Sequence, residues 1–115
     1  MADEFDVICE QCLFKDNSTG VTAKMSSAIA EVNVWFTVAE AQHVRQILDI
    51  AVDAHGLQLG RSVGSKVYWT RDADDRFYLL IGHDDTTWDI GFTLPISTVR
   101  TLVQCVVAAC GRDKC

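Results

Sequence analysis

Three β-rich runs in the second half of the sequence follow one another with only short polar turns between them. The runs cover 63–71, 76–82 and 88–94, and the turns read DADD and HDDT. Turns this short leave no room for a crossover helix, so neighbouring runs must pair antiparallel. The pattern therefore predicts an antiparallel β-meander.

Two segments in which a strand leads into a helix resemble each other. The stretches WFTVAEAQHVRQ and GFTLPISTVRT each end an alternating apolar strand, continue through Phe-Thr and open a helical pattern. Apolar spacing predicts helices over about 39–55 and 97–110. Because the two units match, as in a pseudo-repeat, we expect both helices to pack on the same face of one sheet.

The first of these helices carries signals at both ends. Thr37 and Glu40 have the spacing of a capping box, and Gly56 is placed to end the helix in a left-handed turn. The glycine-rich segment 56–66 is then expected to be a loop. The expected apolar stripe of this helix consists of Ala41, Val44, Leu48, Ala51 and His55, and the apolar face is widened by Ile47, Ile50 and Ala54.

Length and composition limit the architecture to one compact unit. The chain has 115 residues, of which 49% are hydrophobic and 23% charged, as in ordinary globular domains. Residues 1–27 read as an acidic strand and hairpin, and 112–115 as a short polar tail. We expect a single α+β domain over 1–115, with an antiparallel sheet of about five to six strands and two helices on one face.

The formal charge of −6 argues against direct binding to nucleic acid, which requires a surplus of Lys and Arg. An acidic surface keeps a protein soluble, and it also suits a protein partner with a basic surface. No apolar run reaches the length of about 18 residues that a membrane helix needs. The start of the sequence lacks the order of a signal peptide, so we expect a cytoplasmic protein that does not bind membranes.

Five cysteines raise the question of a metal site. Cys9 and Cys12 form a C-x-x-C pair, but in a strand they would point to opposite faces, whereas a zinc site needs converging ligands. Cys9, Cys105 and Cys110 are interpreted as small core residues, and Cys115 as an exposed thiol. No cofactor is expected, with zinc at Cys9 and Cys12 kept as an alternative.

His83, Asp84 and Asp85 lie together in one hairpin turn. A histidine beside two carboxylates could hold a metal or act as a base, but such a site also needs ligands from elsewhere in the fold. Asp and neighbouring polar residues are common in turns for conformational reasons alone. We therefore expect turn chemistry, and keep a metal-binding protein or small enzyme as an alternative.

Large aromatic side chains occur on both faces of the predicted strands. One face is expected to pack on the helices, and the other would then expose an apolar patch, which usually marks a partner or a second protomer. Trp and Tyr dominate binding hot spots. The candidate partner-binding residues are Trp35, Trp69, Tyr68 and Tyr78, with the acidic turn residues Asp72, Asp74 and Asp75.

These observations favour a small acidic protein-binding module without enzymatic activity, such as an inhibitor, an immunity protein or an anti-defence protein. A homo-oligomeric scaffold is the first alternative. The closing stretch TWDIGFTLPISTVRTLVQCVVAAC is similar to the strand–helix ending of type III secretion chaperones, which are small, acidic, dimeric α+β proteins. The likeness covers the last quarter of the chain and includes no specific motif, so we assign no family.

Overall fold

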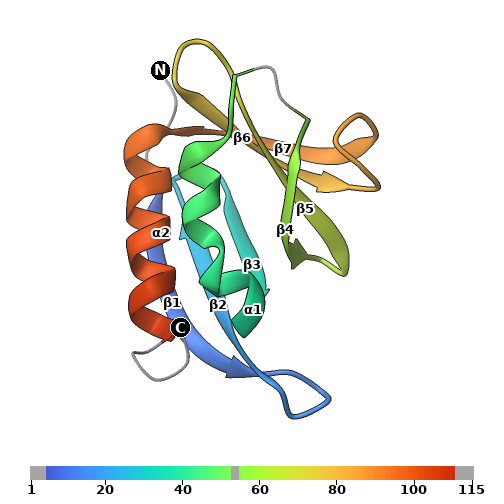
Figure 1. Cartoon of the computed structure of the whole chain (residues 1–115), viewed down its shortest axis with the longest axis vertical. Coiled ribbons are helices and arrows are strands. Elements are labelled where there is room, and N and C mark those ends of the chain that lie inside the picture. Colours follow the sequence, from blue (N-terminus) through green and yellow to red (C-terminus); the bar gives the residue numbers. More distant parts are fainter. Residues whose placement is uncertain (1–4, 53–54, 111–115) are drawn as a thin grey trace.

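Seven strands form one antiparallel sheet in a computed structural model that describes residues 5–52 and 55–110 (Figure 1). Each strand pairs with the next along the chain. The predicted α+β class and antiparallel sheet are confirmed, although the sheet has more strands than expected. The strands are β1 (Asp6–Leu13), β2 (Thr19–Ser26), β3 (Glu31–Thr37), β4 (Leu57–Ser62), β5 (Ser65–Arg71), β6 (Arg76–Gly82) and β7 (Trp88–Pro95).

Strand β4 occupies the segment that was expected to be a glycine-rich loop. Its register shifts between Gln58 and Arg61, and Gly60 in this bulge has a φ of +89°. The Gly60 N–H donates to a carboxylate oxygen of Glu40 at 2.7 Å. Glycine is needed here because a Cβ at this position would lie 2.7 Å from Val34 Cγ1. Glycine therefore marks a close strand crossing.

The first helical segment is shorter than the predicted 39–55. It consists of α1 (Val38–Gln42) and a 3₁₀-helix, η1 (Val44–Asp49). The capping box is confirmed: Thr37 Oγ1 accepts from the Glu40 N–H, and the Glu40 carboxylate accepts from the Thr37 N–H, both at 3.0 Å. Gly56 does not end the helix, and lies just before β4.

A three-residue repeat explains why this segment leaves the α-helical form. The buried residues Ala41, Val44, Ile47 and Ile50 recur at every third position, whereas Leu48 is only partly buried. A 3₁₀-helix has about three residues per turn, so it aligns these four side chains toward the core. The prediction was right to place these four residues on the apolar face, but wrong to continue the face with an α-helical period through Ala51 and His55, which are exposed.

The second helix, α2 (Ile96–Cys110), agrees closely with the prediction. It starts directly after Pro95, and Val99, Leu102, Val103 and Val106 form its buried stripe. Figure 1 shows α1 and α2 side by side in front of β1, β2 and β3. Both helices thus cover one face of the sheet, which we call the inner face, and the opposite face is called the outer face.

The sheet divides between β3 and β4. These strands pair at a single position, Trp35 with Arg61. Beyond that pair, the Ser62 hydroxyl donates to the Asn33 carbonyl at 2.6 Å, which satisfies a backbone group that has lost its strand neighbour. As a result β1–β3 and β4–β7 diverge toward the start of β3.

Candidate functional site

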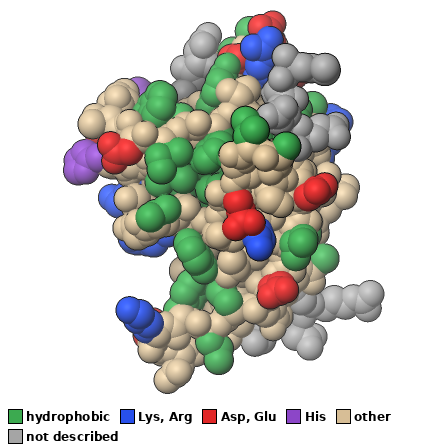
Figure 2. Space-filling model, turned by 180° about the vertical axis from the view of Figure 1, so that it is seen from behind, with side chains coloured by type: hydrophobic (Ala, Val, Ile, Leu, Met, Phe, Trp, Pro, Cys, Tyr) green, Lys and Arg blue, Asp and Glu red, His purple; other side chains and the backbone are tan. Residues whose placement is uncertain are grey.

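The outer face carries a row of cross-strand neighbours with tryptophan at both ends. Trp35 pairs with Arg61, Arg61 with Lys66, Lys66 with Gly82, and Gly82 with Trp88. Residues directly opposite each other in an antiparallel sheet point to the same face. Figure 2 shows hydrophobic side chains gathered in the upper half of the molecule's back, the side away from the helices.

An apolar hollow of about 380 Å³ lies over β5, β6 and β7. The indole of Trp88 lies over Gly91, and Leu80 is close by. A Cβ on Gly91 would be 3.0 Å from the indole and 3.3 Å from Leu80 Cδ2, so only glycine leaves room for the ring. Trp88 itself remains 47% exposed. The hollow is lined by Thr70, Tyr78, Leu80, Trp88, Gly91, Phe92 and Thr93.

Strict alternation would place Trp88 on the same face as Ile90, and this expectation is wrong. The register shifts by one residue where Ile81 pairs with Ile90 but Gly82 pairs with Trp88. The resulting bulge turns Trp88 to the outer face. No turn or glycine signal at Asp89 marks the bulge, so the sequence alone could not reveal this surface tryptophan.

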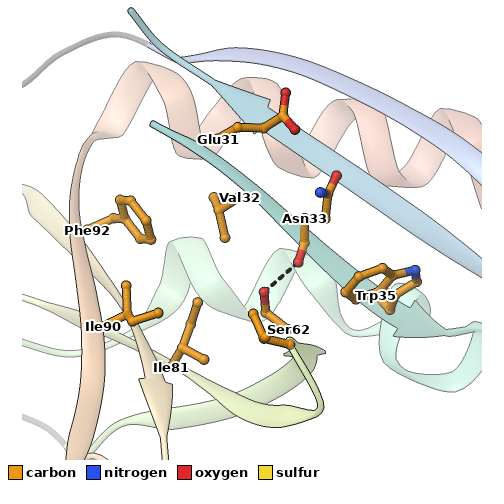
Figure 3. A pocket seen from close by; sticks show the side chains of 9 residues that line it. Glu31, Val32, Asn33, Trp35, Ser62, Ile81, Ile90 and Phe92 are labelled. Carbon is orange, nitrogen blue, oxygen red and sulfur yellow. Dashed lines mark hydrogen bonds between the residues drawn. The ribbon is translucent and has the colours of Figure 1, made fainter. Parts of the chain in front are cut away.

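A second apolar cavity, which we call the cleft, lies where β3 and β4 diverge (Figure 3). Its volume is about 230 Å³. Ile90 and Phe92 point from β7 toward Val32 of β3, and Trp35 stands at its rim. Phe92 lines both the cleft and the hollow, so β7 separates two apolar depressions.

Three of the four predicted aromatic residues lie on the outer face. Trp35 is 36% exposed, and Tyr68 and Tyr78 are half-buried. The Tyr68 hydroxyl donates to the His83 carbonyl at 3.1 Å, and the Tyr78 hydroxyl donates to the Asp72 carboxylate at 2.6 Å. These bonds hold both rings in place.

Trp69 is the exception, because its strand presents it to the inner face. The side chain is fully buried, and its indole N–H donates to the Leu59 carbonyl at 2.9 Å. It belongs to the core together with Phe36 and Phe77. We therefore remove Trp69 from the candidate partner-binding residues.

The acidic turn between β5 and β6 is held by its own hydrogen bonds. The Asp72 carboxylate accepts from the Tyr78 hydroxyl and from the backbone N–H groups of Asp74 and Arg76. The Tyr78 bond is the largest cause that lowers the pKa of Asp72, and the same bond raises the pKa of Tyr78. Asp75 pairs with Arg71. Asp72 and Asp75 thus stabilise the turn.

Two cations, Arg61 and Lys66, separate the two ends of the tryptophan row. They line a polar depression of about 330 Å³ together with His83 and Asp89. At the start of β3, Lys24 and Glu31 form an exposed ion pair of 3.4 Å. The outer face is therefore mixed in charge, although the whole chain is acidic.

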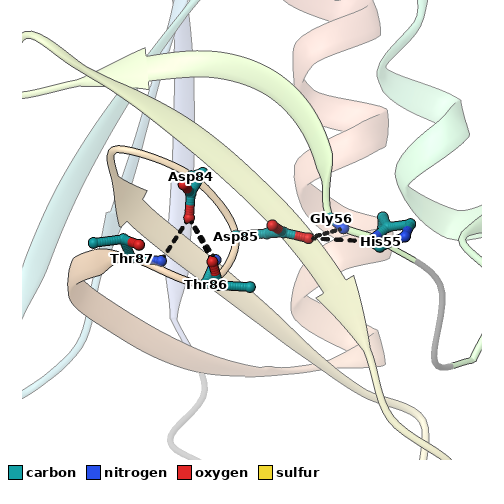
Figure 4. Close-up of polar contacts among 6 residues, drawn as sticks. All are labelled: His55, Gly56, Asp84, Asp85, Thr86 and Thr87. Atoms are coloured by element: carbon teal, nitrogen blue, oxygen red, sulfur yellow. Dashed lines mark hydrogen bonds and ion pairs between the residues drawn. The ribbon is translucent and has the colours of Figure 1, made fainter.

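The turn after β6 uses its carboxylates as expected of a turn (Figure 4). Asp84 accepts from the N–H and hydroxyl of Thr86, both at 2.8 Å, and from the Thr87 N–H at 2.7 Å. Asp85 accepts from the Gly56 N–H at 2.8 Å, and His55 Nδ1 lies 3.9 Å from the same carboxylate. Within 5–52 and 55–110, no three His, Cys, Asp or Glu side chains are placed to hold a metal ion.

We expect acid destabilisation to depend in part on Asp84. The Thr86 N–H and hydroxyl lower its pKa from 3.8 to about 2. A carboxyl whose pKa is lower in the folded state adds stability above pH 4, and this is lost as pH falls through about 2. The advantage of the wild type over Asp84→Asn should therefore shrink between pH 4 and pH 2 in denaturant titrations.

Asp74→Asn is the matched control for this titration. Asp74 lies in the other acidic hairpin turn, where its backbone N–H donates to Asp72. No hydrogen bond to the Asp74 carboxylate is found within the described residues, so Asp74→Asn removes a turn carboxylate without removing an acceptor and corrects for the general loss of one negative charge. A parallel decline for both variants would contradict the role assigned to Asp84.

The cysteines of β1 point to opposite faces, as expected. Cys9 pairs with Ala23 of the inner face, whereas Cys12 pairs with Gly20. Burial raises the pKa of the Cys9 thiol, and the neighbouring Cys105 thiol raises it further. Cys110 is buried, and Cys115 lies outside the described residues. Cys9 and Cys105 therefore join β1 to α2 as packing groups.

Comparison of the chain with protein-family models, curated proteins and solved structures finds no match. Among the helices in the described part of the chain, none has the length and apolar character needed to cross a bilayer. The candidate site therefore has to be interpreted from its own geometry.

Proposed function

We propose that this protein is a non-enzymatic binding module that docks a protein partner on its outer face, as inhibitors, immunity proteins and anti-defence proteins do. The observation that carries the proposal is the exposed aromatic surface formed by Trp35, Tyr68, Tyr78 and Trp88. Both helices cover the inner face, so this surface is open to a partner.

The chemistry of these residues supports docking. Trp and Tyr bury a large area while losing few rotatable bonds, which makes them frequent hot spots. The hydrogen bonds of Tyr68 and Tyr78 already orient two of the rings, and the Trp88 indole lies close over Gly91. A partner would therefore immobilise little side-chain freedom on binding.

Long-range attraction of a partner and direct contact with it depend on different parts of the molecule. The net charge of −6 favours long-range approach of a basic partner. At the surface itself, Arg61 and Lys66 lie between the two tryptophans. We therefore expect the bound state to depend mainly on aromatic burial.

The proposal is tested by capturing the partner from the native host and then measuring its affinity for purified variants. Trp88→Ala is expected to weaken binding by at least about tenfold, since truncation of a hot-spot side chain costs about 2 kcal/mol or more. Trp35→Ala should weaken binding in the same direction. Isothermal titration calorimetry would give both dissociation constants.

Ile29→Ala provides the matched control. Ile29 is an exposed apolar residue in the turn between β2 and β3, outside the tryptophan row. Its replacement should leave the affinity within about twofold of wild type. If Trp88→Ala and Trp35→Ala also leave it unchanged, the outer face is not the docking surface.

A further inference from the structure

The two edges of the sheet are protected very differently. At the β1 edge, Asp6 and Glu10 supply carboxylates. Helix α2 packs against this strand, where the Cys105 thiol donates to the Val7 carbonyl and the Gln11 side-chain amide donates to the Cys110 carbonyl. Charges and covering elements are the usual means of preventing association at an edge strand.

Among the described residues, no helix or further strand protects the central part of the β7 edge. Within the described residues, β7 pairs only with β6. The segment 90–94 reads IGFTL and contains no charge. The bulge at Asp89 limits it on one side, and Pro95, which cannot donate a ladder hydrogen bond, limits it on the other. An uncharged edge of regular strand is therefore open for pairing.

We propose that β7 pairs antiparallel with β7 of a second copy of this chain. The two-fold axis would pass near Phe92, which is the middle residue of the open segment and the position equally far from the bulge and the proline. The two sheets would then join into one continuous sheet, with backbone hydrogen bonds across the axis.

The side chains of the segment complement themselves in this arrangement. Ile90 would lie opposite Leu94 of the second copy, and Phe92 opposite its own equivalent, all on the inner face. Leu94 is fully buried in its own chain and Phe92 packs edge-on against Phe5, so Ile90, which is 43% exposed, supplies most of the apolar side-chain contact. On the outer face Gly91 would meet Thr93. Directly opposite residues on one face form the stabilising pairs of a sheet.

The charges near the segment also favour a second copy. Asp89 is the nearest charged residue in the strand, and it would lie opposite Pro95 of the second copy. In each chain Pro95 pairs with Arg76 of β6. Asp89 of one copy would therefore lie near Arg76 of the other copy, with Pro95 between them. The pairing opposes no like charges, although both chains are acidic.

The arrangement goes beyond the proposed function and does not depend on it. A two-fold axis perpendicular to the sheet keeps both outer faces on the same side. The dimer would therefore present two copies of the tryptophan row on one continuous surface. A partner with two equivalent sites would then gain from simultaneous binding.

The mass of the purified wild-type protein in solution gives the first test. One short strand pair makes a small interface, so we expect a dissociation constant in the micromolar range. Sedimentation equilibrium from about 1 to about 200 µM should show the mass rising from 12.7 kDa toward twice that value. A monomer throughout this range overturns the proposal.

Matched lysine variants at the two edges locate the interface. Ile90→Lys places a charge in the open β7 segment and should weaken dimerisation by at least about tenfold. Ile8→Lys is the control, because Ile8 is 56% exposed on the β1 edge strand and Ile90 is 43% exposed on β7. It should leave the dissociation constant unchanged.

Other results contradict the proposal in distinct ways. If Ile90→Lys still dimerises like wild type, or if Ile8→Lys abolishes dimerisation, the interface lies elsewhere. Circular dichroism shows whether each variant is folded. Should Ile90→Lys be unfolded, hydrogen exchange of the wild type decides: amides in 90–94 should become more protected as concentration rises. If these amides become protected only when another protein is added, the β7 edge binds that protein, and the proposed pairing with a second copy is wrong.

Discussion

Replacing Trp69 with alanine is expected to lower the free energy of unfolding by about 3–5 kcal/mol. The side chain is fully buried between the sheet and the helices, so its removal leaves a large cavity. The Leu59 carbonyl also loses the indole N–H that donates to it at 2.9 Å. Because small domains are stable by only about 5–15 kcal/mol, this loss is a large part of the total.

Trp88→Ala is the control that separates core from surface. Trp88 is 47% exposed, so we expect its replacement to cost about 1 kcal/mol. Urea unfolding of both variants would measure the difference through the transition midpoints. Equal losses would contradict the assignment of Trp69 to the core and Trp88 to the surface.

Gly60→Ala is expected to destabilise the fold by about 2–4 kcal/mol. About 1 kcal/mol comes from placing a side chain on a residue with a φ of +89°. A further 1–3 kcal/mol, approximately, comes from overpacking, because the new Cβ would lie 2.7 Å from Val34 Cγ1 and 3.0 Å from the Phe36 ring. The measurement is again the free energy of unfolding in urea.

Gly64 offers a matched control for the backbone contribution. Its φ of +76° is similar, but among the described residues no atom other than those of its chain neighbours lies within 4 Å of where its Cβ would be. Gly64→Ala should therefore cost only about 1 kcal/mol. If both variants lose the same stability, the close contact between β4 and β3 does not explain why glycine is needed at position 60.

Local signals in the sequence predicted several elements correctly. Short polar turns predicted the β5–β7 meander, and the spacing of Thr37 and Glu40 predicted the start of α1. These features depend on residues within a few positions of one another, so their physical causes are contained in the local sequence. The same is true of α2, whose apolar stripe has a clear α-helical period.

The elements that were predicted wrongly depend on distant contacts. The 3₁₀ form of η1 results from the packing of Val44 and Ile47 into the core, which overrides local α-helical preference. Strand β4 pairs mainly with the neighbouring β5 and with β3 at one position only, and at Gly60 it passes close to Val34 of β3. The packing partners of η1 and the residues of β3 at this crossing are far from their partners in the sequence, unlike the β4–β5 hairpin.

The candidate site shows the same division. Alternation indicated that Tyr68 and Trp69 point to opposite faces, but not which face the helices cover. The fold places Trp69 inside and Tyr68 outside, and the bulge before Ile90 adds Trp88 to the outer face. Sequence periodicity relates neighbours within one strand and carries no information on a register shift between two strands.

The sequence by itself therefore determined the antiparallel meander, the capped start of α1, the extent of α2 and the supply of aromatic residues on both strand faces. Only the tertiary structure decided which aromatic residues are exposed, where the sheet divides and which edge strand remains open. The physical reason is that the first set follows from torsional and hydrogen-bonding preferences of nearby residues. The second set follows from burial, which depends on segments that meet only when the whole chain is folded.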